Sequence, residues 1–149
     1  MTPRRADPHE PGATALLEAS HALMTSLYPP EHCHYLEIDA LREPEIRFFV
    51  VEKDGKSIGC GALKIDDGFG ELKSIFTDPE ARGHGAGEII IDVLEAEALT
   101  AGLTWLRLET GDTLDAAHRL YHRKGYRVCG PFGDYLEGPH SIFMEKRLR

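Results

Sequence analysis

The sequence has few cysteines, and they are too widely spaced to suggest a cross-linked framework. It has 149 residues but only three cysteines, Cys33, Cys60 and Cys129, with no CxxC spacing between them. An odd number of distant cysteines argues against a set of disulfides and against a zinc knuckle. We therefore expect three free thiols that pack as small apolar side chains, and a reducing, cytoplasmic setting.

Long apolar runs and an excess of positive charge are also missing. No uncharged apolar run approaches the roughly 18 residues that a membrane-spanning helix needs. Residues 1–12 contain two arginines with no apolar stretch behind them, so they do not form a signal peptide. The 25 acidic and 17 basic residues give a formal charge of −8, the opposite of the balance typical of nucleic-acid-binding domains. We expect neither a nucleic acid nor a membrane as partner. Any anionic ligand must be bound by a local group of residues, because the overall charge of the protein would repel it.

Length and composition fit one globular domain over residues 1–149. Hydrophobic residues make up 42% and charged residues 28% of the chain, which are ordinary values for a folded protein. No internal repeat or low-complexity linker divides it. Leucine and alanine recur at helical spacing over residues 13–27, before Pro29 and Pro30, and predict a helix there. A shorter, weaker helix is predicted over Tyr35–Arg42.

The following segment has the pattern of antiparallel strands. Ile46–Lys53 and Ser57–Ile65 flank Asp54-Gly55, a dipeptide typical of a type I′ hairpin turn because both of its residues take positive φ. A third strand, Glu71–Thr77, follows a second turn. These segments predict a three-stranded meander.

Helices and strands alternate in the second half of the chain. We predict a helix from about Gly85 to Ala101, a strand at Thr104–Glu109, a helix at Leu114–Lys124 and short strands at Tyr126–Cys129 and Ser141–Lys146. The whole pattern indicates an α/β (α+β) fold with a mixed, mostly antiparallel central sheet flanked by helices. The last strand is expected at a sheet edge, where it is free to pair with a second copy, so we expect a monomer or a homodimer.

A glycine cluster separates the third predicted strand from the long helix: Arg82-Gly83-His84-Gly85-Ala86-Gly87. A helix N-terminus presents unpaired N–H groups and a partial positive charge. Glycines let an anion approach this backbone closely, and the guanidinium of Arg82 suits phosphate. The segment therefore predicts a pyrophosphate cradle on a strand–turn–helix unit. The chain has neither the Gly-Lys-Ser/Thr of a P-loop nor a matching GxGxxG of a dinucleotide fold.

The cluster resembles the acetyl-CoA signature of the GCN5-related N-acetyltransferase (GNAT) family, Arg/Gln-x-x-Gly-x-Gly/Ala. A second element of that family, Leu-Tyr followed by Gly and an aromatic residue, is matched by Leu120-Tyr121 and Gly125-Tyr126. The resemblance covers residue 46 to the C-terminus. It implies the acyl-CoA N-acyltransferase fold, with a first strand within Thr2–Ala6, and acetyl-CoA as co-substrate without a metal. Where many members have Asn at the start of the fourth helix, this chain has Leu114.

The resemblance also implies where acetyl-CoA binds. In the family the fourth and fifth strands separate, and main-chain groups of the fourth strand hold the pantetheine arm and the acetyl carbonyl. The backbone of the glycine turn holds the phosphates, so the ring of His84 is expected to be a spectator. The expected contacts are Ser74, Ile75, Phe76, Thr77, Arg82, Gly83, His84, Gly85, Ala86, Gly87 and Tyr121.

The implied reaction is direct attack of an amine on the acetyl thioester, without a covalent enzyme intermediate. Tyr121 stands where the family places its general acid, and a phenol with a pKa near 10 is protonated at neutral pH. The competing interpretation is a core aromatic, because Leu114, Ala117 and Tyr121 share one helical face. The candidate bases are Glu71, at the start of the fourth strand, and Glu109, at the end of the fifth, because the sheet opens between those strands; a water chain is the alternative.

The acceptor is expected to be a primary amine of a small molecule or a peptide. The negative net charge favours a cationic one. His32-Cys33-His34 has no further metal ligand nearby in sequence, so these histidines are assigned to the acceptor pocket instead. The expected acceptor contacts are His32, His34, Tyr35, Phe132 and Tyr135. Two alternatives remain open: a non-catalytic acyl-CoA-binding or sensor domain, and an interaction domain whose glycine turn is coincidental.

Overall fold

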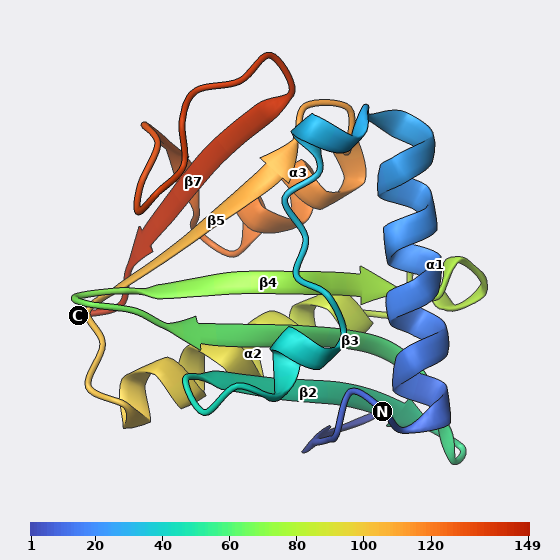
Figure 1. Ribbon diagram of the computed structural model, residues 1–149. Coiled ribbons are helices and arrows are strands. Elements are labelled where there is room, and N and C mark those ends of the chain that lie inside the picture. The colour runs from blue at the N-terminus through green and yellow to red at the C-terminus, as the bar shows by residue number, and fades with distance from the viewer.

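The computed structural model describes residues 1–149 as one seven-stranded sheet with helices on both faces (Figure 1). The strands lie in the order β1-β2-β3-β4-β5-β7-β6. β4 and β5 are parallel, and every other neighbouring pair is antiparallel. This confirms the predicted fold class. The elements are β1 (Thr2–Arg5), α1 (Pro11–Leu27), η1 (Pro30–His32), η2 (Asp39–Arg42), β2 (Ile46–Lys53), β3 (Lys56–Ile65), β4 (Gly70–Thr77), η3 (Pro79–Ala81), α2 (Ala86–Thr100), β5 (Trp105–Gly111), α3 (Asp115–Arg123), β6 (Arg127–Cys129) and β7 (Ser141–Arg147).

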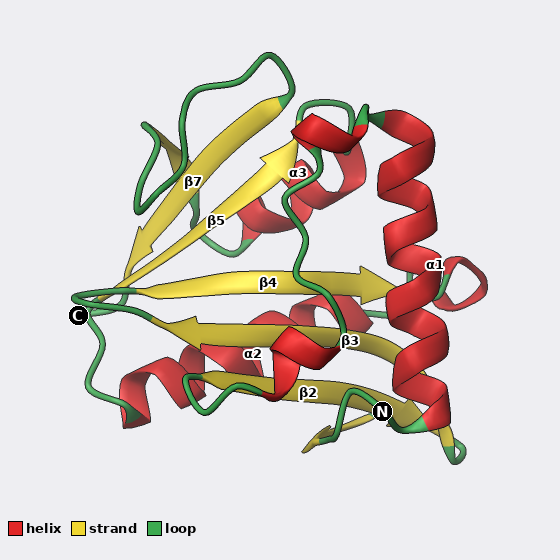
Figure 2. Cartoon of the chain, viewed as in Figure 1, coloured by secondary structure: helices red, strands yellow, loops and turns green.

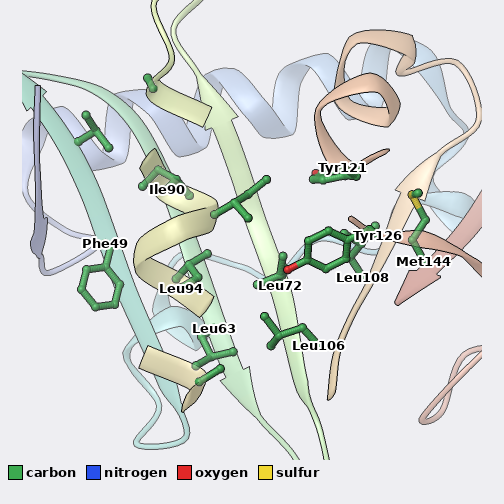
Figure 3. Close-up of a cluster of buried hydrophobic side chains, with 14 of the residues drawn as sticks. Phe49, Leu63, Leu72, Ile90, Leu94, Leu106, Leu108, Tyr121, Tyr126 and Met144 are labelled. Carbon is green, nitrogen blue, oxygen red and sulfur yellow. The ribbon is translucent and has the colours of Figure 1, made fainter. Parts of the chain in front are cut away.

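Each face of the sheet is covered by its own hydrophobic core. Figure 2 shows α1 in front of the strands and α2 behind them. Behind the sheet, Ile90 and Leu94 of α2 belong with Leu72 and Leu106 to one cluster of 16 buried residues (Figure 3). In front, α1 contributes to a second cluster of 10. Because burying one large aliphatic side chain contributes about 1.5–3 kcal/mol, the two clusters hold the helices firmly on the sheet.

β4 and β5 pair only at one end and then separate. Their ladder joins Gly70–Leu72 to Leu106–Leu108 and goes no further. Figure 1 shows the two strands diverging beyond this point. A β-bulge lies at the start of the divergence: Ser74 and Ile75 stand opposite a single residue of β3, and Ser74 has a φ of 56°. Because a bulge bends and twists its strand, it helps to turn β4 away from β5.

Several local predictions are confirmed. The turn at Asp54-Gly55 has φ values of 52° and 77°, as a type I′ turn requires. The strand expected within Thr2–Ala6 exists as β1 and pairs antiparallel with β2. None of the α-helices has the length and apolar character needed to cross a lipid bilayer.

Other predictions are wrong. The helix predicted over Tyr35–Arg42 is reduced to the 3₁₀ turn η2, because so short a segment cannot offset the cost of helix nucleation. The strand Ser141–Lys146 is not at an edge: β7 lies between β5 and β6, and the three-residue β6 forms that edge of the sheet.

Of the three thiols, only Cys60 is fully buried, and Cys33 and Cys129 are half-buried. Burial raises the pKa of Cys60 to about 12, so its thiol is unreactive at neutral pH. The expectation of small buried side chains therefore holds for Cys60 alone.

Candidate active site

A groove of about 650 Å³ lies between the glycine turn, the C-terminal end of β4 and α3. Its walls are the C-terminal part of β4, the start of α2, the middle of α1 and most of α3. It is lined by Ser20, Leu23, Met24, Ile75, Phe76, Thr77, Arg82, Gly83, Gly85, Ala86, Gly87, Glu88, Thr113, Leu114, Asp115, Ala116, Ala117, Leu120, Tyr121 and Arg123. The sequence did not predict that α1 and α3 line this groove, except through Tyr121. Only the tertiary structure brings these two helices next to β4.

The glycine turn has the geometry of an anion cradle. Gly83 and Gly85 have φ values of 85° and 87°, a conformation that side chains other than glycine rarely adopt. A Cβ at either position would meet no atom within 4 Å, so the backbone is open on that side. Gly85 is the N-cap of α2, whose first N–H groups are free to bind an anion. Arg82 is exposed beside them. These features fit the diphosphate of acetyl-CoA.

Gly87 lines the groove and also packs against α3, whereas His84 and Ser74 lie outside the groove lining. A Cβ at Gly87 would lie 2.8 Å from Cδ2 of Leu120, so this glycine makes room for α3. His84 is exposed and does not line the groove, and Ser74 lines a second cavity beside it. Leu114, at the position where many family members have Asn, is the N-cap of α3 and lines both spaces.

The second cavity, of about 90 Å³, adjoins the groove. Five residues line both spaces: Ser20, Met24, Ile75, Leu114 and Tyr121. The cavity is completed by His34, Tyr35, Leu72, Lys73, Ser74, Leu108, Glu109, Thr110 and Gly111. A ligand in the groove and a ligand in the cavity would therefore meet at a common wall, in the opening between β4 and β5.

Tyr121 belongs to that common wall. Figure 3 shows it between the ribbons of β4 and β5. Its side chain is 7% exposed, and its ring lies edge-on to Tyr126 at 6.2 Å between centroids. Burial, with a smaller contribution from the charge of Glu109, raises the pKa of the phenol. The hydroxyl therefore keeps its proton at every pH at which the protein is expected to work.

The two candidate carboxylates differ in their surroundings. Glu109 lines the cavity and accepts a hydrogen bond from Ser141 Oγ at 2.7 Å. Burial raises its pKa, and the neighbouring charge of Glu71 adds to the shift. Glu71 lines neither space: it is 5% exposed, lies 3.3 Å from Lys73 Nζ and accepts a hydrogen bond from Tyr135 at 2.6 Å.

The structure brings some of the expected acceptor contacts together and separates others. His34 and Tyr35 line the cavity. Tyr135 does not line it but is hydrogen-bonded to Glu71 and to Lys73, which does. His32 does not line the cavity: its ring lies 5.2 Å from that of His140.

Phe132 is buried in a small cluster with Phe69 and Phe143, away from the cavity lining. Lys73, in contrast, lines the cavity and was missed. Its spacing of two residues from Glu71 on one strand placed both on the same face, which was the available signal. No three His, Cys, Asp or Glu side chains converge in a way that would hold a metal ion.

A mixed sheet that opens between two parallel strands, beside an anion-binding turn at the head of a helix, defines the class of acyl-CoA N-acyltransferases. The sequence model of the Acetyltransferase (GNAT) family matches residues 13–126. The chain belongs to this family, and it is an acyltransferase. GNAT enzymes use acetyl-CoA as acyl donor and acetylate amine acceptors.

Similar proteins cover nearly the whole chain. The "IAA acetyltransferase" of Azospirillum brasilense is 40% identical over 150 residues, which is 99% of this chain and 98% of that protein. The uncharacterized N-acetyltransferase YsnE of Bacillus subtilis (strain 168) is 39% identical over 84% of this chain and 85% of its own length.

Solved structures show the same fold. An acyl-CoA N-acyltransferase structure from Klebsiella pneumoniae superimposes with a TM-score of 0.84 at 33% identity, over 99% of this chain and 97% of that one. The acetyltransferase yncA of Salmonella typhimurium, solved with acetyl-CoA, gives a TM-score of 0.74 at 21% identity, over 99% of this chain and 94% of that one. At that identity the likeness concerns the fold alone.

Proposed function

We propose that residues 1–149 act as one acetyl-CoA-dependent N-acetyltransferase domain that transfers an acetyl group to a primary amine by direct attack. The observation that carries this proposal is the common wall of the groove and the cavity. A thioester at the end of the groove and an amine in the cavity would lie on the two sides of Tyr121. Such proximity removes much of the entropic cost of a bimolecular reaction.

Acetyl-CoA is held first at its phosphates. The N–H groups at the start of α2 and the guanidinium of Arg82 bind the diphosphate. The pantetheine arm follows the groove between β4 and α3. Residues 75–77 of β4 lie beyond the ladder to β5, so their main-chain groups on that side are free to bind the arm and the acetyl carbonyl.

Glu109 is the proposed base. A primary amine is mostly protonated at neutral pH and must lose a proton before it attacks. Glu109 is the carboxylate that lines the cavity, and its raised pKa makes it a better proton acceptor than an ordinary glutamate. Glu71 is engaged by Lys73 and Tyr135, so we assign it a positioning role.

Tyr121 is the proposed acid. As the amine nitrogen forms its bond to the acetyl carbon, the carbon–sulfur bond breaks and the electron pair remains on sulfur. The departing thiolate, whose conjugate acid has a pKa near 8.5, takes its proton from the phenol. The ammonium gives its first proton to Glu109 before the attack, and Glu109 passes it to solvent. Once the carbon–nitrogen bond has formed, the nitrogen releases a second proton, which restores the phenol of Tyr121, so the net products are the acetamide, CoA thiol and one proton.

The test is turnover with purified protein. Acetyl-CoA is incubated with amines, amino acids and short peptides, while CoA thiol release is followed and acetylated products are identified by mass spectrometry. Acetyl-CoA binding is measured separately by calorimetry. Binding together with acetylation of at least one amine supports the proposal. Binding without transfer to any acceptor would favour the sensor domain, and no binding would leave the groove without its assigned ligand.

A further inference from the structure

One wall of the cavity is held in place by the hydrogen bonds of one buried lysine. Lys73 is 9% exposed. Its Nζ donates to the main-chain oxygen of His34 at 2.9 Å and to the hydroxyl of Tyr135 at 2.8 Å. It thereby joins β4 to two distant segments, the linker 33–38 and the loop 130–140. Figure 1 shows this linker, between η1 and η2, crossing in front of β4.

The linker is also attached to α1. Tyr35 stacks on His21 of α1 with 4.0 Å between ring centroids and 14° between ring planes. The ring of His34 meets that of Tyr135 edge-on at 5.6 Å. Contacts between buried or half-buried groups therefore hold α1, the linker 33–38 and the loop 130–140 around the cavity. A peptide bound by its terminal amine needs a continuous channel for the chain that follows, and these contacts hold the linker and the loop in place on one side of the cavity.

The size of the cavity limits the acceptor in the same way. A buried water needs about 10–15 Å³ of such space, so the 90 Å³ of this cavity accommodates on the order of six to nine atoms of that size. This volume suits a small amine.

The charges around the cavity favour a cation that carries no carboxylate. The charge of Lys73 is balanced by Glu71 at 3.3 Å. Glu109 forms no ion pair with a lysine or arginine, and only Ser141 donates a side-chain hydrogen bond to it. His34 lines the same cavity through the linker. Glu109 has no ion pair with a lysine or arginine, and the ammonium of Lys73 is already paired with Glu71, so the carboxylate of Glu109 attracts an ammonium group in this space and repels a second carboxylate; the charges of His34 and Lys73 reduce this effect.

We infer that the acceptor is a compact monoamine with a single positive charge and no carboxylate, and that α-amino acids and peptide N-termini are excluded. This inference rests on the proposed function and names the substrate class of the same site. The wall joined by Lys73 excludes the peptide, and the unpaired Glu109 excludes the amino acid.

The test compares three acceptors that share one side chain: isobutylamine, valine and valyl-glycyl-glycine. Their kcat/KM values are measured with acetyl-CoA by thiol release. We expect isobutylamine to exceed both others by about tenfold or more. A higher value for valine or for the peptide would overturn the inference while leaving the acetyltransferase proposal intact. Failure of all three, with no acetylation of any wider set of amines, would overturn both.

A binding measurement separates recognition from catalysis. Calorimetry with the enzyme–CoA complex gives the Kd of isobutylamine and of valine for the wild type and for Glu109→Gln. The preference for isobutylamine should shrink toward onefold in Glu109→Gln. Glu43→Gln is the matched control, because Glu43 is exposed and lines neither space, and it should keep the preference. A preference unchanged in Glu109→Gln would refute the charge argument.

A variant of Tyr135 tests whether the cavity wall held by Lys73 excludes a peptide acceptor. Tyr135→Phe keeps the ring and removes the hydroxyl that joins Lys73 to the loop. The kcat/KM for valyl-glycyl-glycine relative to isobutylamine should rise severalfold in this variant, with thermal unfolding as the check that it is folded. A folded variant that still excludes the peptide to the same degree would show that this wall does not set the limit.

Discussion

Gly87 in the first turn of α2 lies against Leu120 of α3 so closely that a Cβ at Gly87 would come within 2.8 Å of Leu120 Cδ2. Both residues line the groove proposed for acetyl-CoA. The pair sets the distance between the two helices that form the walls of that groove. A glycine of the signature motif therefore acts through helix packing as well as through its backbone.

Gly87→Ala should leave stability nearly unchanged but weaken acetyl-CoA binding. Alanine gains up to about 1 kcal/mol in a helix relative to glycine, and the atom it meets is the flexible end of a leucine. Leu120 must then shift within the wall of the groove, so the Kd of acetyl-CoA should rise severalfold by calorimetry. Gly130→Ala is the control, because a Cβ there meets no atom within 4 Å. An equal Kd for both variants would contradict the packing role.

Gly85 is expected to be critical for binding the phosphates. Its φ of 87° makes Gly85→Val strained in the backbone, so this variant should lose thermal stability as well as affinity. Gly85→Asn is the sharper test, because asparagine tolerates the left-handed conformation. Both should raise the Kd of acetyl-CoA by about tenfold or more through obstruction of the cradle. A folded Gly85→Asn with unchanged affinity would remove the cradle assignment. Arg82→Ala should have a milder effect, since the backbone donors remain.

The variant Tyr121→Phe distinguishes between two roles of Tyr121, that of a general acid and that of an aromatic side chain that only packs in the core. Loss of the hydroxyl should lower kcat by roughly 10²–10⁴-fold with little change in acetyl-CoA affinity. Because burial raises the pKa of Tyr121, the wild-type rate should show no loss from phenol ionisation up to about pH 9, beyond which an ordinary tyrosine begins to ionise. Steady-state kinetics with one accepted amine check both points. Near-normal kcat in the folded variant would make Tyr121 a packing residue.

Glu109 should make stability depend on pH. Its pKa in the folded protein is raised above the ordinary value of 4.5. Between these two values the folded state holds more protons than the unfolded state, so stability falls as pH rises through this window. Glu109→Gln should flatten that slope and be more stable than the wild type at neutral pH, as urea unfolding at a series of pH values would show. A steeper slope in the variant would mean that the carboxylate is stabilised by folding.

The same shift should appear in catalysis. If Glu109 accepts the proton of the amine, kcat/KM should rise with pH through the raised pKa of its carboxyl, above the range of an ordinary glutamate. Glu71→Gln tests the other carboxylate: it disturbs Lys73 and Tyr135 and should raise KM for the amine more than it lowers kcat. A pH profile that loses its acid limb in Glu71→Gln and keeps it in Glu109→Gln would exchange the two roles.

The features that the sequence determined by itself depend on local chemistry. Asp54-Gly55 specifies a hairpin because few other residue pairs tolerate two positive φ values in succession. The glycines at 83 and 85 specify the open turn for a similar reason, and alternating or helical apolar spacing specifies most of the strands and helices. These constraints act within a few residues, so they can be read without knowledge of the fold.

Only the tertiary structure determined which strands are neighbours and which distant segments are in contact. It placed β7 inside the sheet, because β5 pairs along the whole of β7 and leaves the short β6 outside. It joined Lys73 to Tyr135, 62 residues away, and left Phe132 in a core cluster. Such contacts depend on how the helices and loops pack across the sheet, and no local pattern encodes a hydrogen bond between segments so far apart. The residues proposed to bind acetyl-CoA could therefore be named from the chain alone, whereas most residues that line the proposed acceptor cavity could be identified only from the fold.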